Sequence, residues 1–565
     1  MSLLLYLDRF CISISTDYIR QDLGITPQII SWLSSAFFFA YALGQVPSGW
    51  LTDRWGVRLM LSAYILAWSA FTGLQAFAYS FTVLCLLQIG CGLAQAGAYP
   101  AGARLVRDWN PPTRRGSASA IVALGGRAGG ALAPLLTAWM MVQFVPASRD
   151  SAVTDRTVLD GPRFAARLAS NPASPLDLRR LEHLREHLDS DEQRLIATLA
   201  AADLEHAPAT PLQNQQLRQM INRWLDQPDL YVPGLYQDII EREGRRLAQL
   251  QASHGTLSQD QLRRLNRLLL EAMFPKTLGN IYVHGWRPSM LVYGAVGLVV
   301  AALFWRGVRD TPQQDPRCNA AERRSISWDD AAPPPHGAAA PEVFPWRAML
   351  TDVSLWGNCL LQFTTNVGWV FLVRTMPTYL SEVHQVPLVT RGWMTSIPIW
   401  AGMISIFYGG RWADALAQRL GLKWGRRVPV LITRFTAALG YGLCIAFNWL
   451  VPHDQAPEWF PWLYVAALSL VSLSTDFGIP AVWAFAQDVG GKYTASIHGW
   501  GNMWGNLGAA LSTPFYEYLL GAHTLAEWNR LFLCLGGVYL LGVAGVLVMD
   551  ATRPLTTRIV PPDSA

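Results

Sequence analysis

The stretch GWLTDRWGVR, Gly49–Arg58, lies where one apolar segment of the chain ends and the next begins. Its two glycines permit a tight turn at a membrane surface, and its aspartate and arginines can form charge and helix-end interactions. A basic connection between two apolar segments is also what the positive-inside rule places in the cytoplasm. We therefore expect a helical hairpin whose loop can latch neighbouring helices through Gly49, Asp53, Arg54, Gly56 and Arg58.

Segments of the same apolar character recur along the whole chain. Of its 565 residues, 51% are hydrophobic and 15% are charged, whereas soluble globular chains carry about 25% charged residues. A membrane-spanning helix needs roughly 20 predominantly apolar residues. Twelve such helices are expected, over residues 1–20, 31–51, 57–77, 81–104, 116–143, 286–305, 353–380, 392–409, 428–449, 461–487, 495–521 and 529–549. The sequence thus predicts an all-α membrane protein.

The distribution of arginine predicts the orientation of these helices. Cytoplasmic loops carry an excess of Lys and Arg. The ends of the even-numbered segments carry such residues, whereas the loop Ala76–Phe81 between the third and fourth segments has no charge. Both chain termini are therefore expected in the cytoplasm, and the net charge of +5 reflects this topology rather than a nucleic-acid partner. Only seven residues precede Asp8, so the first helix is expected to be short at its cytoplasmic end or to begin upstream of Met1.

Two stretches interrupt the apolar pattern. Residues 144–284 are rich in charge and in Leu at helical spacing, and Pro-rich turns divide them, which predicts a mainly helical extracytoplasmic insertion. Residues 310–346 are polar and rich in Pro and Ala, which is typical of a flexible linker. The expected division is 1–143 for the first five spanning helices, 144–284 for the insertion, 285–309 for the sixth helix, 310–346 for a cytoplasmic linker, 347–552 for six further helices and 553–565 for a cytoplasmic tail.

The two sets of six helices share sequence features in the same order. Pro100 stands eight residues before Asp108, and Pro480 stands eight residues before Asp488. GRAGGALAP in the fifth segment corresponds to GNLGAALSTP in the eleventh, and GWLTDRWGVR corresponds to GGRWADALAQR after the eighth. Such matches are expected of a parallel six-plus-six duplication. We therefore predict two pseudo-symmetric six-helix bundles.

These motifs resemble those of a known transporter family. GWLTDRWGVR is similar to the signature loop of the major facilitator superfamily. Within it, the chain resembles the anion:cation symporters, such as hexuronate and galactonate permeases and sialin, through YLDRFCISIS, GLAQAGAYP, NVGWVFLVRTMPTYL and DVGGKYTASIHGWGNMWGNLGAALS. The resemblance covers the chain except 144–284 and 310–346. It implies the major facilitator fold, a location in the bacterial inner membrane, a small organic anion as substrate, protons as a coupling ion and no cofactor.

The resemblance also implies roles for residues of the first two helices. Asp8 corresponds to an acid implicated in proton coupling, and Arg9 to a base implicated in anion binding or gating. Tyr6 and Tyr41 match positions whose phenols contact sugar-acid substrates, although packing is an equally good explanation for each. Adjacent helical positions point about 100° apart, so Asp8 and Arg9 need not pair with each other.

Further candidates come from the polar residues of other helices. A charge in the bilayer is expensive, so Arg127, set among glycines, is expected to bind the substrate carboxylate, with a structural role as the alternative. Asn366, Trp369, Asn502 and Asn506 are candidate hydroxyl contacts, with polar packing between helices as the alternative.

The chain departs from the resembled family in three places. Gln95 stands where the family has Glu, Gln88 where it has Arg, and Arg374 where it has a small polar residue. Gln cannot titrate, so a relay through that Glu is absent, and Asp476 is a possible second titrating group. Gln95 and Arg374 are retained as substrate-binding candidates; a second interpretation of Arg374 is a side chain that reaches the outer interface.

Other chemistries find little support in the sequence. HLREH, His183–His187, fits a zinc-peptidase pattern but lies in a Leu-, Arg- and Glu-rich run, so no metal is predicted. No G-x-x-x-x-G-K-[ST] motif supports ATP-driven transport.

The predicted function is therefore secondary transport, and no enzymatic activity. The expected protein is a monomer that imports a sugar acid or related carboxylate with protons by alternating access. A proton-independent uniporter or anion exchanger remains an alternative, favoured by Gln95, as does a receptor that senses a ligand through 144–284.

Overall fold

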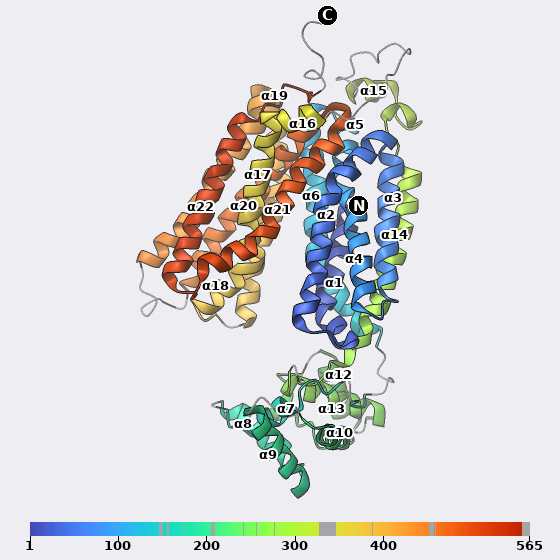
Figure 1. Ribbon diagram of the computed structural model, residues 1–565, viewed down its shortest axis with the longest axis vertical. Coiled ribbons are helices and arrows are strands. Elements are labelled where there is room, and N and C mark those ends of the chain that lie inside the picture. The colour runs from blue at the N-terminus through green and yellow to red at the C-terminus, as the bar shows by residue number, and fades with distance from the viewer. Residues whose placement is uncertain are drawn as a thin grey trace, which may run out of the picture.

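The N-terminal half of the protein is a bundle of six membrane-crossing segments in the computed structural model (Figure 1). The structure describes residues 1–145, 151–154, 157–172, 174–204, 209–240, 242–255, 257–275, 277–326, 346–386, 388–450, 457 and 459–555. The six segments are α1 (Ser2–Leu23), α2 (Pro27–Trp55), α3 (Val57–Gln75), α4 (Phe81–Ala96) with α5 (Ala98–Trp109), α6 (Arg115–Gln143) and α14 (Trp286–Gly307).

The C-terminal half repeats this arrangement with six further segments. They are α17 (Val353–Val370) with the π-helical turn η5 (Phe371–Thr375) and α18 (Met376–Glu382), two segments within α19 (Leu388–Leu450), then α20 (Pro461–Gly490), α21 (Thr494–Leu520) and α22 (Leu525–Val548). The two segments of α19 meet at Gly421, whose φ of 77° is non-helical. The prediction of two six-helix bundles is confirmed.

Composition alone identifies fewer spans than the fold contains. Among the described residues, 7 helical stretches are long and apolar enough to cross a membrane. They are Val57–Gln75, Phe81–Trp109, Pro112–Gln143, Ile281–Gly307, Thr390–Leu450, Pro461–Leu520 and Leu525–Val548, and the fifth and sixth of them each contain two spans. Helices α1, α2 and α17 are not in this set. Polar side chains lie along two of them, such as Asp8 and Arg9 in α1 and Gln362 and Asn366 in α17. Those polar helices line the cavity described below.

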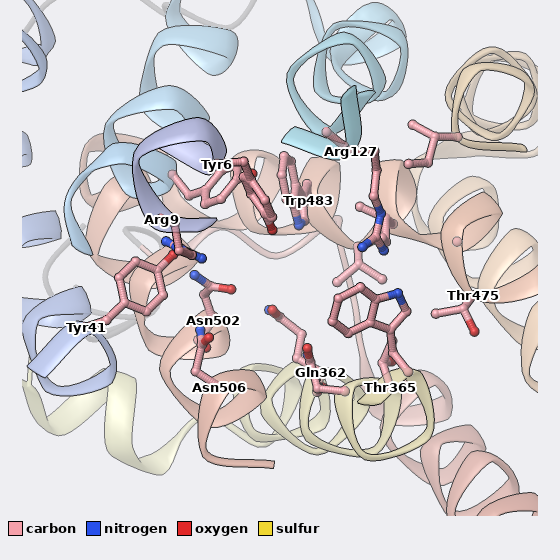
Figure 2. A pocket seen from close by; sticks show the side chains of 18 of the residues that line it. Tyr6, Arg9, Tyr41, Arg127, Gln362, Thr365, Thr475, Trp483, Asn502 and Asn506 are labelled. Atoms are coloured by element: carbon pink, nitrogen blue, oxygen red, sulfur yellow. Dashed lines mark hydrogen bonds between the residues drawn. The ribbon is translucent and has the colours of Figure 1, made fainter. Parts of the chain in front are cut away.

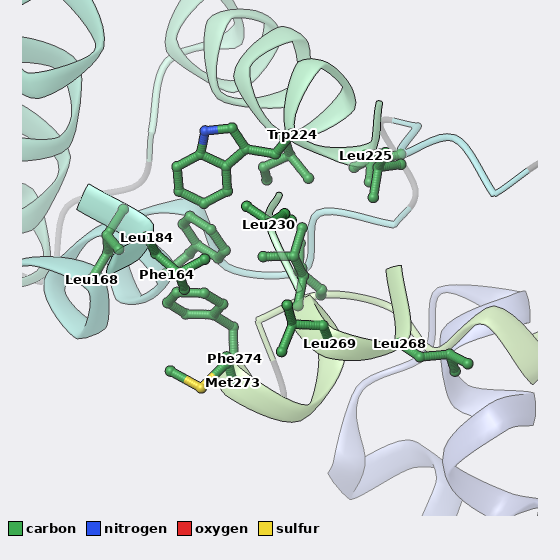
Figure 3. Packing of buried hydrophobic residues seen from close by; sticks show 14 of the residues in the cluster. Phe164, Leu168, Leu184, Trp224, Leu225, Leu230, Leu268, Leu269, Met273 and Phe274 are labelled. Atoms are coloured by element: carbon green, nitrogen blue, oxygen red, sulfur yellow. The ribbon is translucent and has the colours of Figure 1, made fainter. Parts of the chain in front are cut away.

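The insertion between α6 and α14 is a separate helical body with its own core (Figures 1 and 3). Phe164 and Phe274 lie with ring centroids 4.1 Å apart at its centre, beside the fully buried Trp224. Its helices begin at cap residues: Ser174 and Thr210 each accept a backbone hydrogen bond just before a proline at the first helical position. The helices are α7 (Gly161–Ala169), α8 (Pro175–Arg185), α9 (Ser190–Leu204), α10 (Pro211–Leu225), α11 (Pro233–Tyr236), α12 (Arg242–His254) and α13 (Gln259–Met273).

The chain leaves and re-enters the N-terminal bundle at one point. A Cβ atom on Gly285 would lie 2.4 Å from the carbonyl oxygen of Met141, so the end of α6 and the start of α14 are in direct contact. Asp22 at the end of α1 pairs with Arg287 at 2.9 Å. The backbone N–H of Asn280 donates to Gln21 at 2.8 Å. These contacts fix the insertion to the ends of α1 and α14.

The expected linker and tail are described only in part. Residues 310–326 contain the short turn η3 (Pro312–Gln314) and the helix α15 (Ala320–Ile326), and α16 (Trp346–Thr351) precedes the second bundle. Residues 327–345 of the linker and 556–565 of the tail lie outside the described residues.

Candidate functional site

A cavity of about 140 Å³ lies between the two bundles (Figure 2). Both halves contribute to its lining, through α1, α2, α5 and α6 on one side and α17, α19, α20 and α21 on the other. Three arginines face it, and none of the described residues that line it is an aspartate or a glutamate. The polar and aromatic lining residues are Tyr6, Arg9, Tyr41, Tyr99, Arg127, Gln362, Thr365, Asn366, Trp369, Arg434, Thr475, Trp483, Asn502 and Asn506.

Arg9 is held at the cavity by aromatic rings and one amide. Its guanidinium carbon lies 4.3 Å from the ring centroid of Tyr41 and 5.2 Å from that of Tyr6, distances typical of cation–π contacts. Its Nε donates to Gln95 Oε1 at 3.2 Å, and its Nη2 has no hydrogen-bond partner. Figure 2 shows the guanidinium directed toward the interior. Gln95 is fully buried behind Arg9 and is not among the residues that line the cavity, so it positions Arg9.

Arg127 reaches across the cavity to the other half. Its Nη2 donates to Asp476 Oδ1 at 2.5 Å, and the guanidinium carbon lies 4.5 Å from the ring centroid of Trp369. The side chain of Asp476 is 2% exposed. Arg127 on α6 therefore already has a countercharge, supplied by α20 of the opposite bundle.

Arg434 on α19 is a third cation at the cavity that was not predicted from the sequence. It is 1% exposed, its Nη1 donates to Thr365 Oγ1 at 2.7 Å, and its guanidinium lies 4.8 Å from the ring centroid of Tyr539. Its Nε has no partner. Arg434 stands alone in the apolar run VPVLITRFTAALGYG, so the argument that identified Arg127 could also have identified it.

Neutral polar side chains complete the lining. Asn366 and Asn506 donate their amide hydrogens to carbonyls one turn back in their own helices, those of Gln362 and Asn502. Gln362 Nε2 and Asn502 Nδ2, by contrast, are buried donors with no partner. The cavity therefore presents hydrogen-bond donors and cations, which is the chemistry that binds carboxylates.

Like Gln95, the residues Asp8, Gln88 and Arg374 do not line the cavity. Asp8 is buried inside the N-terminal bundle, where its Oδ2 accepts from Trp68 Nε1 at 2.9 Å and its Oδ1 has no partner. Gln88 accepts from Gln75 at 2.8 Å. Arg374 is exposed and contacts Thr513 at 3.5 Å. The structure does not bring Asp8 or Arg374 into the cavity, and Asp8 does not pair with Arg9.

The expected latch residues lie where the bundles meet, at the end of the cavity away from the insertion. Asp53 accepts backbone hydrogen bonds from Ala495 at 3.1 Å and Ser496 at 2.8 Å, at the N-terminus of α21, and pairs with Arg104 at 3.2 Å. A Cβ on Gly49 would lie 2.6 Å from the carbonyl oxygen of Ala495, so only glycine allows this approach. Gly56 turns the chain with a φ of 86°.

Arg54 and Arg58 contact aromatic residues of their own bundle. Arg54 packs over Trp50, and Arg58 packs over Trp305 with its guanidinium 4.5 Å from the ring centroid.

An aspartate also binds the N-terminus of a helix in the opposite bundle at the pseudo-symmetric position. Asp414 on α19 accepts from the backbone N–H groups of Gly116 at 2.9 Å and Ser117 at 2.7 Å, at the N-terminus of α6. A carboxylate is favoured there by the unpaired amide groups and the helix dipole. Arg426 bridges Asp414 to Asp488, which also binds Arg115 at 2.9 Å. These contacts close the cavity on this side.

The histidines of the insertion are engaged in its own packing. His183 Nδ1 lies 3.0 Å from the hydroxyl of Tyr236, and His187 Nδ1 lies 3.0 Å from the carbonyl of His183. Burial and the neighbouring His187 lower the pKa of His183 below its ordinary value of 6.5. No group of three or more His, Cys, Asp or Glu suited to a metal ion was found among the described residues.

Comparisons with known proteins agree with this architecture. A probable sulfoacetate transporter, SauU from Cupriavidus necator, is 22% identical over 572 aligned positions, covering 100% of this chain and 94% of that protein. The crystal structure of the transporter FucP in the outward conformation superposes with a TM-score of 0.53 at 12% identity, covering 97% of this chain and 96% of that one, which is a likeness of fold.

Sugar-acid transporters are similar over shorter stretches. The probable galactarate/D-glucarate transporter GudP of Pseudomonas putida is 42% identical over 122 residues, and the probable L-galactonate transporter of Escherichia coli is 35% identical over 137. These matches cover 20% and 24% of this chain, and 27% and 30% of those proteins.

The family model described as "Major Facilitator Superfamily" matches residues 1–147 and 277–513, which is most of the two bundles and leaves out most of the insertion. The chain therefore belongs to the major facilitator superfamily.

Proposed function

We propose that the protein is a secondary transporter that moves a small organic anion, such as a sugar acid, across the membrane by alternating access. The observation that carries this proposal is the cavity between the bundles, lined by Arg9, Arg127 and Arg434 and by no described carboxylate. Substrate sites of such transporters lie near the bilayer midplane between the two repeats. The similarity to transporters of galactarate, galactonate and sulfoacetate supports an anionic substrate.

The proposed orientation follows from the charged helix ends. The helices carry Arg54, Arg104, Arg115 and Arg426 at the closed end of the cavity, which favours the cytoplasmic side of a bacterial inner membrane. Both termini would then be cytoplasmic and the insertion would lie outside. In this orientation the ion pairs of Asp53, Asp414 and Asp488 close the cytoplasmic entrance, as expected of an outward-facing state.

Proton coupling is the finer part of the proposal. Two buried acids could carry the proton: Asp8, with an unpartnered Oδ1, and Asp476, which pairs with Arg127. An anion in the cavity would favour protonation of the nearby Asp476, and protonation of Asp476 would leave the positive charge of Arg127 to attract the anion, so each event favours the other. This reciprocity is what couples a proton to an anion.

Proton-independent uniport or exchange is the second candidate function. Gln95 supports it, because this side chain binds Arg9 and cannot titrate. A receptor function through the insertion is a third candidate, which the separate core of that body supports.

The deciding experiment is uptake into proteoliposomes that contain the purified protein. Galactarate, L-galactonate and sulfoacetate are supplied as labelled substrates, and galactitol serves as the uncharged control. We expect uptake of at least one anion, accelerated by an inward proton gradient and abolished in Arg127→Gln. The matched control is Arg374→Gln, which removes an exposed arginine outside the cavity and is expected to transport normally. Uptake insensitive to the proton gradient would select exchange or uniport, and no uptake of any anion would contradict the transporter proposal.

A further inference from the structure

Two arginines of the cavity have no countercharge. Within the described part of the chain, Arg127 forms an ion pair with Asp476, but neither Arg9 nor Arg434 forms one. Both are at least nine-tenths buried, with exposures of 9% and 1%. Each retains a guanidinium nitrogen without a hydrogen-bond partner, Nη2 of Arg9 and Nε of Arg434.

A buried cation without a countercharge is costly, since its desolvation is not offset by an ion pair. Cation–π contacts with Tyr41 and Tyr539 and single bonds to Gln95 and Thr365 offset only part of that cost. The cavity thus has two positive charges for which the described protein supplies no negative partner. A bound ligand is the natural source of the missing charges.

The two cations belong to different halves of the protein. Arg9 is on α1 in the first bundle, and Arg434 is on α19 in the second. The amides of Gln362 and Asn502, each with an unpartnered N–H donor, also line the cavity. The lining therefore has two cationic poles and neutral donors that suit hydroxyl or ether oxygens.

From this arrangement we infer that the substrate is a dianion, with one anionic group bound at Arg9 and the other at Arg434. Arg434 with Thr365 forms the second anion subsite. Two carboxylates, or a carboxylate and a sulfonate, on a short polar chain fit this charge pattern. A monoanion would leave one of the two buried cations uncompensated. The inference rests on the proposed transport function and specifies its substrate class.

A dianion bound in this way also links the bundles. With Arg127 already neutralised by Asp476, both uncompensated charges are neutralised only when the ligand contacts both halves at once. The cavity can then close around a dianion without buried excess charge, whereas closure around a monoanion leaves one charge uncompensated. The transporter would thus discriminate by charge, because closing the cavity around a monoanion leaves a buried cation unpaired.

Binding to the full-length purified protein tests the inference separately from transport. Isothermal titration compares galactarate with galactonate, which share a carbon skeleton but carry two charges and one, and sulfoacetate with acetate. In the wild type we expect the dianion of at least one pair to bind about tenfold or more tightly than its monoanionic counterpart. In Arg434→Gln the dianion should lose that advantage while monoanion binding changes by less than about threefold.

Further variants distinguish a local effect of charge from damage to the fold. Arg434→Lys keeps the charge and should keep the preference for the dianion, and Arg374→Gln, outside the cavity, should behave as wild type. If Arg434→Gln does not fold, the inference is tested by the preference for dianions over monoanions in the wild type and in Arg434→Lys. Equal wild-type affinity for dianions and monoanions, no binding of any dianion, or an equal loss of both in Arg434→Gln would overturn the inference.

The outcome also separates the inference from the transport function. A dianion that binds selectively but is not taken up by proteoliposomes would contradict the transport function and uphold the subsite. Anions taken up without regard to their charge would uphold transport and overturn the subsite.

Discussion

Arg127 on α6 donates a hydrogen bond to Asp476 on α20, with Nη2 and Oδ1 2.5 Å apart, and so joins the middle of one bundle to the other. Arg127 lies 12 residues beyond the start of its helix at Arg115, which at 1.5 Å per residue is about 18 Å from the closed end. The pair must separate if the halves part on that side. A substrate carboxylate or a proton on Asp476 would weaken it.

Removing one member of this pair should cost more than removing both. Asp476→Asn leaves Arg127 buried without its countercharge, and Arg127→Gln does the same to Asp476, a change that typically costs about 3–5 kcal/mol. The double variant leaves two neutral groups. We expect the melting temperature of the detergent-solubilised protein to fall in each single variant and to recover partly in the double variant. Strictly additive effects would contradict an energetic link between the two residues.

Asp8→Asn separates proton coupling from anion exchange. Asparagine can still accept the hydrogen bond from Trp68 Nε1, which is 2.9 Å long in the wild type, so the packing of the first bundle should persist. If Asp8 carries the proton, proteoliposomes of the variant should lose gradient-driven accumulation by tenfold or more but keep counterflow. Accumulation equal to that of the wild type would assign the proton to another group, with Asp476→Asn as the next variant to test.

The two helix-capping aspartates should have equivalent roles. Asp53 binds the N-terminus of α21 and Asp414 that of α6, and both contacts join the bundles at the closed end. A charged hydrogen bond of this kind contributes about 1.5–3 kcal/mol. Asp53→Asn and Asp414→Asn should therefore each favour opening of this end.

Spin labels at the exposed positions Arg114 and Arg419, one in each half, report the opening of the closed end. In double electron–electron resonance, we expect both aspartate variants to show a larger population with a long distance between the two labels. Asp17→Asn, at a side chain 84% exposed on α1, is the matched control. A change in one aspartate variant but not the other would show that the two helix-capping contacts do not contribute equally to closure.

The sequence predicted the fold because a lipid bilayer imposes a strict length and polarity on each helix. The repeated Pro-to-Asp spacing and the paired loops further predicted two matching bundles. Arg127 could be placed at the cavity on the same ground, because a lone charge in an apolar helix is expensive unless it faces a polar space. The same reasoning applies to Arg434, which lies in an equally apolar run but was not singled out.

Pairings between the halves could not be predicted in this way. Whether Arg127 meets Asp476 depends on how two bundles dock, and no local pattern encodes that contact. Asp8 and Arg9 are neighbours in sequence, yet one bonds Trp68 inside the bundle and the other lines the cavity, because adjacent helical positions point about 100° apart. Which of them faces the cavity is decided by the helices around α1.

The insertion should be less stable in acid. The pKa of His183 is lowered by burial and by His187, so the unfolded chain binds a proton more readily than the folded domain. Stability should therefore be fully present above the ordinary pKa of 6.5 and fall as the pH drops below it. Hydrogen exchange of α8 and α11 in the full-length protein, corrected for intrinsic rates, should show lower protection at about pH 5.5 than at about pH 7.5. His183→Gln should remove most of this difference, and an unchanged difference would assign it to other groups.

The insertion should be dispensable for transport. The end of α6 and the start of α14 are in contact through Met141 and Gly285, so a short Gly/Ser linker can replace residues 146–279 without moving either helix. The cavity lining contains no residue of the insertion, and the insertion has its own core, against which Tyr18 of α1 and Val142 of α6 pack. We therefore expect the shortened protein to bind the same anion within about threefold and to retain proteoliposome uptake. A receptor that senses its ligand through the insertion would give two different results. Neither form would transport, and only the full-length protein would bind the anion.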